Sequence, residues 1–400
     1  MPAVIYLLLA SALWLGGQAP SPDQSDVNLL KRIRKQMLAN LERQPNYTCV
    51  ETVERTRHSG AGRKLEMQDK LRLEVALVDG NEIFAKPGSR KFEETDLRAF
   101  IPDGAFGNGN FALHARAIFG EQGVTFQRGR ASIAGGKSVV RYDYAMPARL
   151  SGYRIRISER ETTVGYHGAI YADPTSLDVR RIEVIADDIP AEFDLLQASD
   201  VVDYERVQIG GSDFLLPVRS QLIMTDRHQQ ENRNEVRFKD CHLFTGESKL
   251  SFDDPLPESG APSAVVREVE LPGNLELSVS LLEELDLGDA AVGDPVRAGL
   301  PLDLRFGKEL LFPKGSIASG RITRMERWPG FIVVGLVFTE IASERAHAQL
   351  NLKLQSIANQ RMWMPQSRVI LATPPRTGEA VITLREGMRK LPRIRTVWRT

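Results

Sequence analysis

The sequence contains only two cysteines and no excess of charge of either sign. Lys plus Arg and Asp plus Glu number 52 each in 400 residues, so the protein has no net charge with which to attract nucleic acid or acidic substrates. We therefore expect no nucleic-acid partner. Hydrophobic residues make up 42% and charged residues 26%, which is ordinary globular composition, and the length favours two domains over one.

Signatures of catalysis and metal binding are also missing. The six histidines are scattered, and no pair has metal-ligand spacing on a predicted helix. There is no Gly-x-Ser-x-Gly nucleophile elbow, and the acidic residues are too numerous to single out a catalytic pair. We predict no cofactor, no metal and no enzymatic activity, while a hydrolase site built from distant residues stays open as the alternative. The histidines are His58, His114, His167, His228, His242 and His347.

One short stretch matches a relaxed phosphate-loop pattern, with alanine in the first glycine position. It spans residues 131–138 and reads ASIAGGKS. A phosphate loop needs a helix directly after it, so that backbone N–H groups face the phosphates. Residues 139–146 instead alternate as a strand, so we interpret the two glycines as a hairpin turn and expect no nucleotide.

The N-terminus resembles a secretory signal. An apolar run over residues 4–14 is too short to span a bilayer and is followed by small residues and a polar, proline-containing segment. We predict a signal peptide, residues 1–19, cut after Ala19, and hence a periplasmic or secreted protein. Because this region carries no Lys or Arg, a short membrane anchor is the alternative. No cysteine follows the run, so lipid attachment there is excluded.

The two cysteines, Cys49 and Cys241, lie far apart in the chain, and each falls in a strand-like run. In an oxidising compartment they could form a disulfide, which would close a long loop and remove unfolded-chain entropy. Two buried free thiols are the equal alternative.

Most of the first 246 residues read as antiparallel strands. Two runs rich in Val, Ile and Tyr within residues 164–185 flank the turn residues 173–176, and the phase of the second run indicates a bulge near Arg180 and Arg181. Apolar residues three or four apart over residues 26–43 predict an amphipathic helix before the strands. The breakers around residues 111–119 indicate a second, short helix.

The rest of the chain divides at a proline-rich stretch. Residues 247–268 read as a linker between a domain over 25–246 and a smaller one over 269–373, whose short strands predict a small β-barrel or sandwich. Residues 374–400 are basic, and we interpret them as a solvated, frayed tail rather than a contact patch for anionic lipid or a partner. The fold class is thus mainly β with a few helices (α+β): a curved antiparallel half-barrel sheet with an N-terminal helix, plus a second small β-domain.

The first domain resembles the lipoprotein carriers and receptors LolA and LolB and the regulator RseB. The resemblance rests on an N-terminal helix before many antiparallel strands, on the segment 168–174 (GAIYADP) leading into 177–182, and on 204–207 with 214–217. In that family a concave, unclosed barrel covered by helices holds acyl chains. The resemblance therefore implies an apolar groove, but it assigns no individual ligand residue.

The second domain, about residues 266–373, looks like a smaller copy of the β-domain in TrbI-like proteins of conjugative secretion machinery. The segments 293–298 (GDPVRA), 312–316 (FPKGS) and 320–322 (GRI) carry this likeness. In those proteins the domain builds an envelope-spanning assembly, which implies an envelope protein partner here.

Two functions of different classes follow. The first is a non-enzymatic carrier that holds a lipid or other apolar ligand in the concave face of the sheet; the second is a structural or interaction protein of the envelope or of a secretion-type assembly. The predicted groove lining is the set of alternating apolar residues on the sheet. The alternative interpretation of most of these residues is ordinary core packed under the helix. This set is Leu73, Val75, Tyr142, Tyr144, Ile170, Phe214, Leu216, Leu222, Val236 and Phe238.

Overall fold

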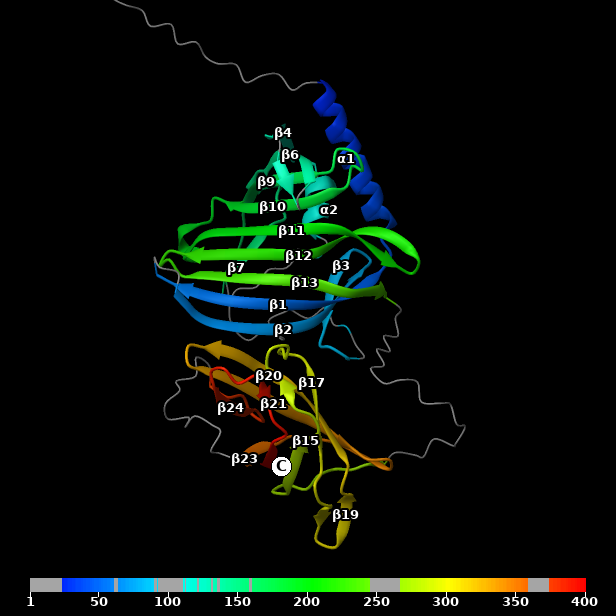
Figure 1. Ribbon diagram of the computed structural model, residues 1–400, viewed down its shortest axis with the longest axis vertical. Coiled ribbons are helices and arrows are strands. Elements are labelled where there is room, and N and C mark those ends of the chain that lie inside the picture. The colour runs from blue at the N-terminus through cyan, green and yellow to red at the C-terminus, as the bar shows by residue number, and fades with distance from the viewer. Residues whose placement is uncertain are drawn as a thin grey trace, which may run out of the picture.

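Figure 1 shows the computed structural model of the chain, in which two β-rich units follow one another. The structure describes residues 24–60, 64–89, 92, 111, 113–120, 122–130, 132–134, 137–157, 160–244, 267–358 and 374–400. The described residues up to 244 are called the first unit, and those from 267 onward the second unit. The predicted signal peptide and most of the predicted linker lie outside the described residues.

The first unit is built on one large antiparallel sheet. Its strands lie side by side in the order β6, β9, β10, β11, β12, β13, β1, β2 and β3, with β4 and β5 both along the outer edge of β6. No described pairing joins β3 to β4 or β5, so the curved sheet is open, as predicted.

The elements of the first unit are α1 (Gln24–Arg43), β1 (Tyr47–Ser59), β2 (Lys64–Val78), β3 (Asn81–Ala85), α2 (Leu113–Gly120), β4 (Thr125–Arg128), β5 (Ser132–Ala134), β6 (Lys137–Met146), β7 (Arg154–Ile157), β8 (Arg160–Thr163), β9 (Gly165–Ala172), β10 (Val179–Asp187), β11 (Leu195–Ile209), β12 (Ser212–Asp226) and β13 (Glu231–Leu243). Two 3₁₀ turns, Ala148–Leu150 and Ala191–Phe193, complete it.

Helix α1 covers one part of the sheet, and its sequence explains how. Ile33, Met37 and Leu41 recur three or four residues apart, so they share one face of the helix and are buried. Asn40 on the same side donates from Nδ2 to the carbonyl of Leu215 at 2.8 Å, and its Oδ1 accepts from the Leu215 N–H at 2.9 Å. Apolar packing and this pair of hydrogen bonds together hold the helix on β12.

The local predictions for the first unit agree with the structure. The register of β10 against β9 shifts between Val179 and Arg181, which is the predicted bulge. Within the phosphate-loop match, β5 pairs antiparallel with β6, with Ala134 opposite Lys137, and β6 stands where a phosphate loop would require a helix. The predicted turn at residues 135–136 lies outside the described residues. The predicted fold class, mainly β with few helices and a large curved sheet, is confirmed.

The second unit is a smaller, mostly antiparallel β structure. Strand β20 pairs with β17 and β21, β15 pairs with β17 and β26, and only the short β14 runs parallel to its neighbour β22. Its strands are β14 (Arg267–Glu268), β15 (Glu276–Leu281), β16 (Leu285–Asp286), β17 (Pro295–Gly299), β18 (Leu304–Phe306), β19 (Glu309–Phe312), β20 (Ile317–Trp328), β21 (Phe331–Ala342), β22 (Ala346–Gln349), β23 (Lys353–Ile357), β24 (Ala380–Arg385), β25 (Lys390–Leu391) and β26 (Arg395–Arg399).

The interpretation of residues 374–400 as a frayed tail is wrong. These residues form β24, β25 and β26, and β26 lies between β15 and β23. Trp398 is fully buried and its ring meets Phe338 edge-on, with centroids 5.8 Å apart. The arginines that suggested a solvated tail include Arg395 and Arg399, which are exposed on β26 while Thr396 and Trp398 point inward.

The two units are joined by backbone hydrogen bonds. Gln68 and Asp69 of β2 pair with β20, and the N–H of Arg72 donates to the carbonyl of Val292 at 2.8 Å. Val292 returns a 2.8 Å bond to the carbonyl of Lys70. The sheet of the first unit therefore continues into the second, and Figure 1 shows β2 beside β20 at this junction.

Candidate ligand-binding face

One face of the large sheet carries a buried row of side chains that crosses eight strands. Strand pairing places one residue of each strand beside the next, and all eight are buried. The row is Leu71, Val53, Val236, Ser220, Val202, Ile182, Ile170 and Tyr142. Because Val202 and Ile182 pack with α1 and α2 in a single core, we call this the inner face.

The adjacent row, two residues along each strand, is partly polar. It contains Asp69, Arg55, Asn234, Leu222, Asp200, Val184, Gly168 and Tyr144. Asp69, Arg55, Asn234 and Asp200 are all buried. A buried charged or amide group is costly unless it is paired, so the partners of these residues matter.

Two side-chain contacts involve this polar row. Arg55 on β1 forms a two-pronged pair with Asp69 on β2, in which Nε donates to Oδ1 at 2.8 Å and Nη2 bonds Oδ2. His114 on α2 places Nε2 3.0 Å from Oδ2 of Asp200 on β11. The contact between His114 and Asp200 links helix α2 to strand β11 of the sheet.

Several polar atoms on this face have no hydrogen-bond partner among the described residues. These atoms are Oδ1 of Asp200 and the hydroxyls of Tyr47 and Tyr204, and all three residues are at most 3% exposed. Burial raises the pKa of both tyrosines, so each hydroxyl keeps its proton and can donate. A buried polar atom without a partner costs free energy, which a bound polar group would recover.

Glu51 adds a buried acid to the same face. It lies on β1 between Leu73 of β2 and Phe238 of β13 and is 2% exposed. Burial, with a smaller contribution from the charge of Glu82, raises its pKa to about 8. At neutral pH the Glu51 carboxyl is therefore largely protonated and can donate as well as accept a hydrogen bond.

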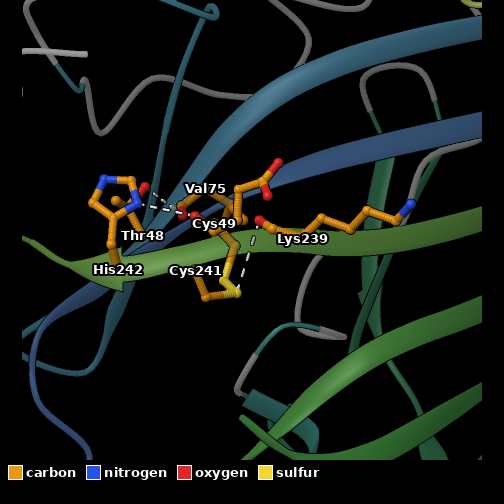
Figure 2. Close-up of a disulfide and its surroundings, with 7 residues drawn as sticks. Thr48, Cys49, Val75, Lys239, Cys241 and His242 are labelled. Atoms are coloured by element: carbon orange, nitrogen blue, oxygen red, sulfur yellow. Dashed lines mark hydrogen bonds between the residues drawn. A yellow bond between two sulfur atoms is a disulfide. The ribbon is translucent and has the colours of Figure 1, made fainter. Parts of the chain in front are cut away.

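The cysteines meet on the neighbouring strands β1 and β13, where the structure joins Cys49 and Cys241 as a disulfide across 192 residues of sequence (Figure 2). The bond sits at a bulge, because Thr48 faces His242 while Val50 faces Lys239. It therefore fixes β1 to β13 two residues from Glu51.

The ten predicted lining residues are all buried, and nine of them divide between two cores. Tyr142, Tyr144 and Ile170 belong to the core packed with α1 and α2. Leu222 lies in the polar row between Asn234 and Asp200. The other six form a separate core that includes Phe111, and they are Leu73, Val75, Phe214, Leu216, Val236 and Phe238.

Two hollows lie elsewhere in the part of the chain that the structure describes. One of about 460 Å³ borders Arg267 and Phe306 in the second unit, and one of about 250 Å³ lies at the junction, bordered by Asp69 and Arg327. None of the ten lining residues borders either hollow. Within the described residues, no group of His, Cys, Asp and Glu is arranged to hold a metal ion.

The polar row was missed at the sequence level, although a signal for it exists. Glu51 and Arg55 are in phase with Val53, and Asp69 is in phase with Leu71, so strand alternation alone puts these charges on the apolar side. His114 carries no such signal, because its partner Asp200 is far away in sequence.

Comparisons with known proteins give only loose likenesses. No family model matches the chain, and no curated protein does. A putative outer membrane lipoprotein-sorting protein domain from Vibrio parahaemolyticus is similar at 13% identity and TM-score 0.30, covering 56% of this chain and 96% of its own. A DUF1329 family protein from Desulfovibrio piger is similar at 7% identity and TM-score 0.30, covering 57% and 96%.

At this TM-score no residue role or ligand is transferred from either structure. Neither is a TrbI-like protein, so the resemblance of the second unit to that class stays a prediction. In the described part of the chain, no helix has both the length and the apolar character needed to cross a membrane.

Proposed function

We propose that this chain is an exported, non-enzymatic binding protein of the cell envelope that holds a lipid or another apolar ligand on the inner face of its first sheet. The observation that carries the proposal is that a largely apolar row lies beside buried polar atoms of Tyr47, Tyr204 and Asp200 that have no hydrogen-bond partner among the described residues. If these positions served only as core, apolar groups there would make the fold more stable than unpaired polar atoms do.

The two rows fit the two ends of an amphiphile. An apolar chain lying along the row from Leu71 to Tyr142 gains about 0.8 kcal/mol per buried CH₂ group. A polar head group placed beside Tyr204 and Asp200 supplies the missing hydrogen bonds. Neither of the two hollows described above is bordered by a residue of the row from Leu71 to Tyr142. The ligand therefore takes its place by displacing α1 and α2 where they pack on Val202 and Ile182.

A structural or interaction protein of the envelope is the second candidate. The observation that favours it is an exposed apolar hairpin in the second unit, with Leu302 65% and Phe306 55% exposed. Exposed apolar side chains that gather in one place mark contact surfaces. In this alternative the first sheet is a scaffold and its polar row serves only to fix the arrangement of strands.

Native mass spectrometry of the chain purified without detergent from an exporting host tests the proposal. An organic extract of the same sample identifies any bound molecule. A discrete adduct identified as a lipid is the expected result. The second candidate would be favoured by two results together. The purified chain would have the mass of the protein alone, and the chain in the host membrane fraction would be found bound to an envelope protein.

A further inference from the structure

Exposed large apolar side chains gather on one hairpin of the second unit. Of the nine such residues in the described chain, three lie within nine positions of sequence: Leu302, Phe306 and Leu310. The hairpin consists of β18 and β19, and Figure 1 shows it projecting from the end of the second unit that is far from the first. Single exposed apolar residues are ordinary, but a cluster on a projection needs a physical explanation.

Both faces of this two-stranded ribbon carry an exposed apolar group. Phe306 pairs with Glu309, and Arg305 pairs with Leu310. Because neighbouring residues of a strand point to opposite faces, Phe306 and Leu310 lie on different sides of the ribbon. A single flat protein surface would cover only one of them, whereas a medium that surrounds the tip covers both.

The charges along the hairpin, from its turn to its open end, leave a basic excess. Asp303 lies 3.1 Å from Arg305, and Glu309 lies 3.2 Å from Arg267, so each carboxylate has a cation beside it. Lys308 in the turn and Lys314 after β19 have no ion pair within the described residues. These ammonium groups flank the apolar side chains, which is the arrangement that favours an anionic interface.

We propose that the β18–β19 hairpin inserts Phe306 and Leu310 into the interfacial region of an anionic lipid bilayer. The apolar side chains enter the boundary between head groups and acyl chains, and Lys308 and Lys314 contact the anionic head groups. The inference does not depend on a ligand in the first unit, because it rests on residues of the second unit alone.

Co-sedimentation with vesicles tests this docking. The wild-type chain is mixed with vesicles of phosphatidylcholine alone or with an equal part of phosphatidylglycerol. We expect the Phe306→Ser, Leu310→Ser double variant to bind the anionic vesicles about tenfold more weakly. Lys308→Gln should weaken binding about fivefold, and only to the anionic vesicles.

The matched control is the Leu65→Ser, Leu196→Ser double variant, which removes two equally exposed leucines from the first unit. It should bind as the wild type does. An environment-sensitive dye on Leu310→Cys should shift its emission to the blue with anionic vesicles, while the same dye on Arg219→Cys should not. Equal binding of the hairpin and control variants, together with an unshifted dye at position 310, would overturn the proposal, as would a wild-type chain that binds neither vesicle.

Discussion

His114 and Asp200 form a buried contact between α2 and the sheet, with Nε2 3.0 Å from Oδ2 and both residues less than 10% exposed. Loss of the imidazole would leave both carboxylate oxygens of Asp200 buried without a partner among the described residues. We expect His114→Ala to lower the free energy of unfolding by about 1–3 kcal/mol in urea titrations. His167→Ala is the control, since its pair with Asp187 is exposed and should contribute less than about 0.5 kcal/mol. Equal losses in the two variants would show that the buried contact has no special role.

Glu51 should make stability depend on pH. Its pKa of about 8 in the folded protein lies above the ordinary value of 4.5, so between these values the folded state binds more protons than the unfolded state. The contribution of Glu51 to the free energy of unfolding is therefore lost as the pH rises from about 4.5 to about 8.

The isosteric Glu51→Gln variant cannot ionise and should lack this loss. Urea titrations from pH 4 to pH 9 should show the wild type falling below the variant by an amount on the order of a few kcal/mol. A difference between the two proteins that is constant over this range would contradict the raised pKa.

The disulfide fixes β1 to β13 at the bulge beside Glu51. The Cys49→Ser, Cys241→Ser double variant should have a free energy of unfolding lower by about 2–5 kcal/mol, because the disulfide closes a loop of 192 residues. Reduction of the wild type should reproduce this loss, and the reductant should leave the double variant unchanged. A double variant as stable as the oxidised wild type would rule out a stabilising role for the bond.

Arg72 should couple the two units energetically. Its Nη1 donates to both carboxylate oxygens of Asp294 at 2.8 and 2.7 Å, across 222 residues of sequence. A double-mutant cycle with Arg72→Ala and Asp294→Ala should give a coupling free energy of about 1–3 kcal/mol in urea titrations. The exposed pair of Arg305 and Asp303 is the matched control, with an expected coupling near zero. A coupling for Arg72 no larger than the control would indicate that the ion pair does not hold the junction.

Local pattern was sufficient to predict much of this fold. Apolar spacing predicted α1, and the phase of Val179 and Ile182 predicted the bulge that the strand register contains. Strand alternation could have placed the charged residues of the polar row on the apolar side, but their alignment into one row could not be predicted, because it depends on the register of strands far apart in sequence, such as those that carry Arg55 and Asp200. Residues 374–400 were predicted as a tail because of their arginines, but on β26 the buried Thr396 and Trp398 alternate with the exposed Arg395 and Arg399, as in a strand with one buried face.

The measurement that tests the central claim most directly compares ligand retention in the wild type, in a Tyr47→Phe, Tyr204→Phe double variant and in a control variant. Tyr204→Phe and Tyr47→Phe each remove a buried hydroxyl that has no partner among the described residues, so neither should destabilise the ligand-free protein. Tyr171→Phe is the control, since Tyr171 packs in a separate small core with Val139 and Ala169 and its hydroxyl bonds Glu183 at 3.0 Å.

By native mass spectrometry, the wild type and Tyr171→Phe should keep the lipid adduct, while the Tyr47→Phe, Tyr204→Phe double variant should lose about nine-tenths of it, a free-energy difference of about 1.4 kcal/mol. Equal retention in all three proteins, or no adduct in any of them, would contradict a ligand on the inner face of the first sheet.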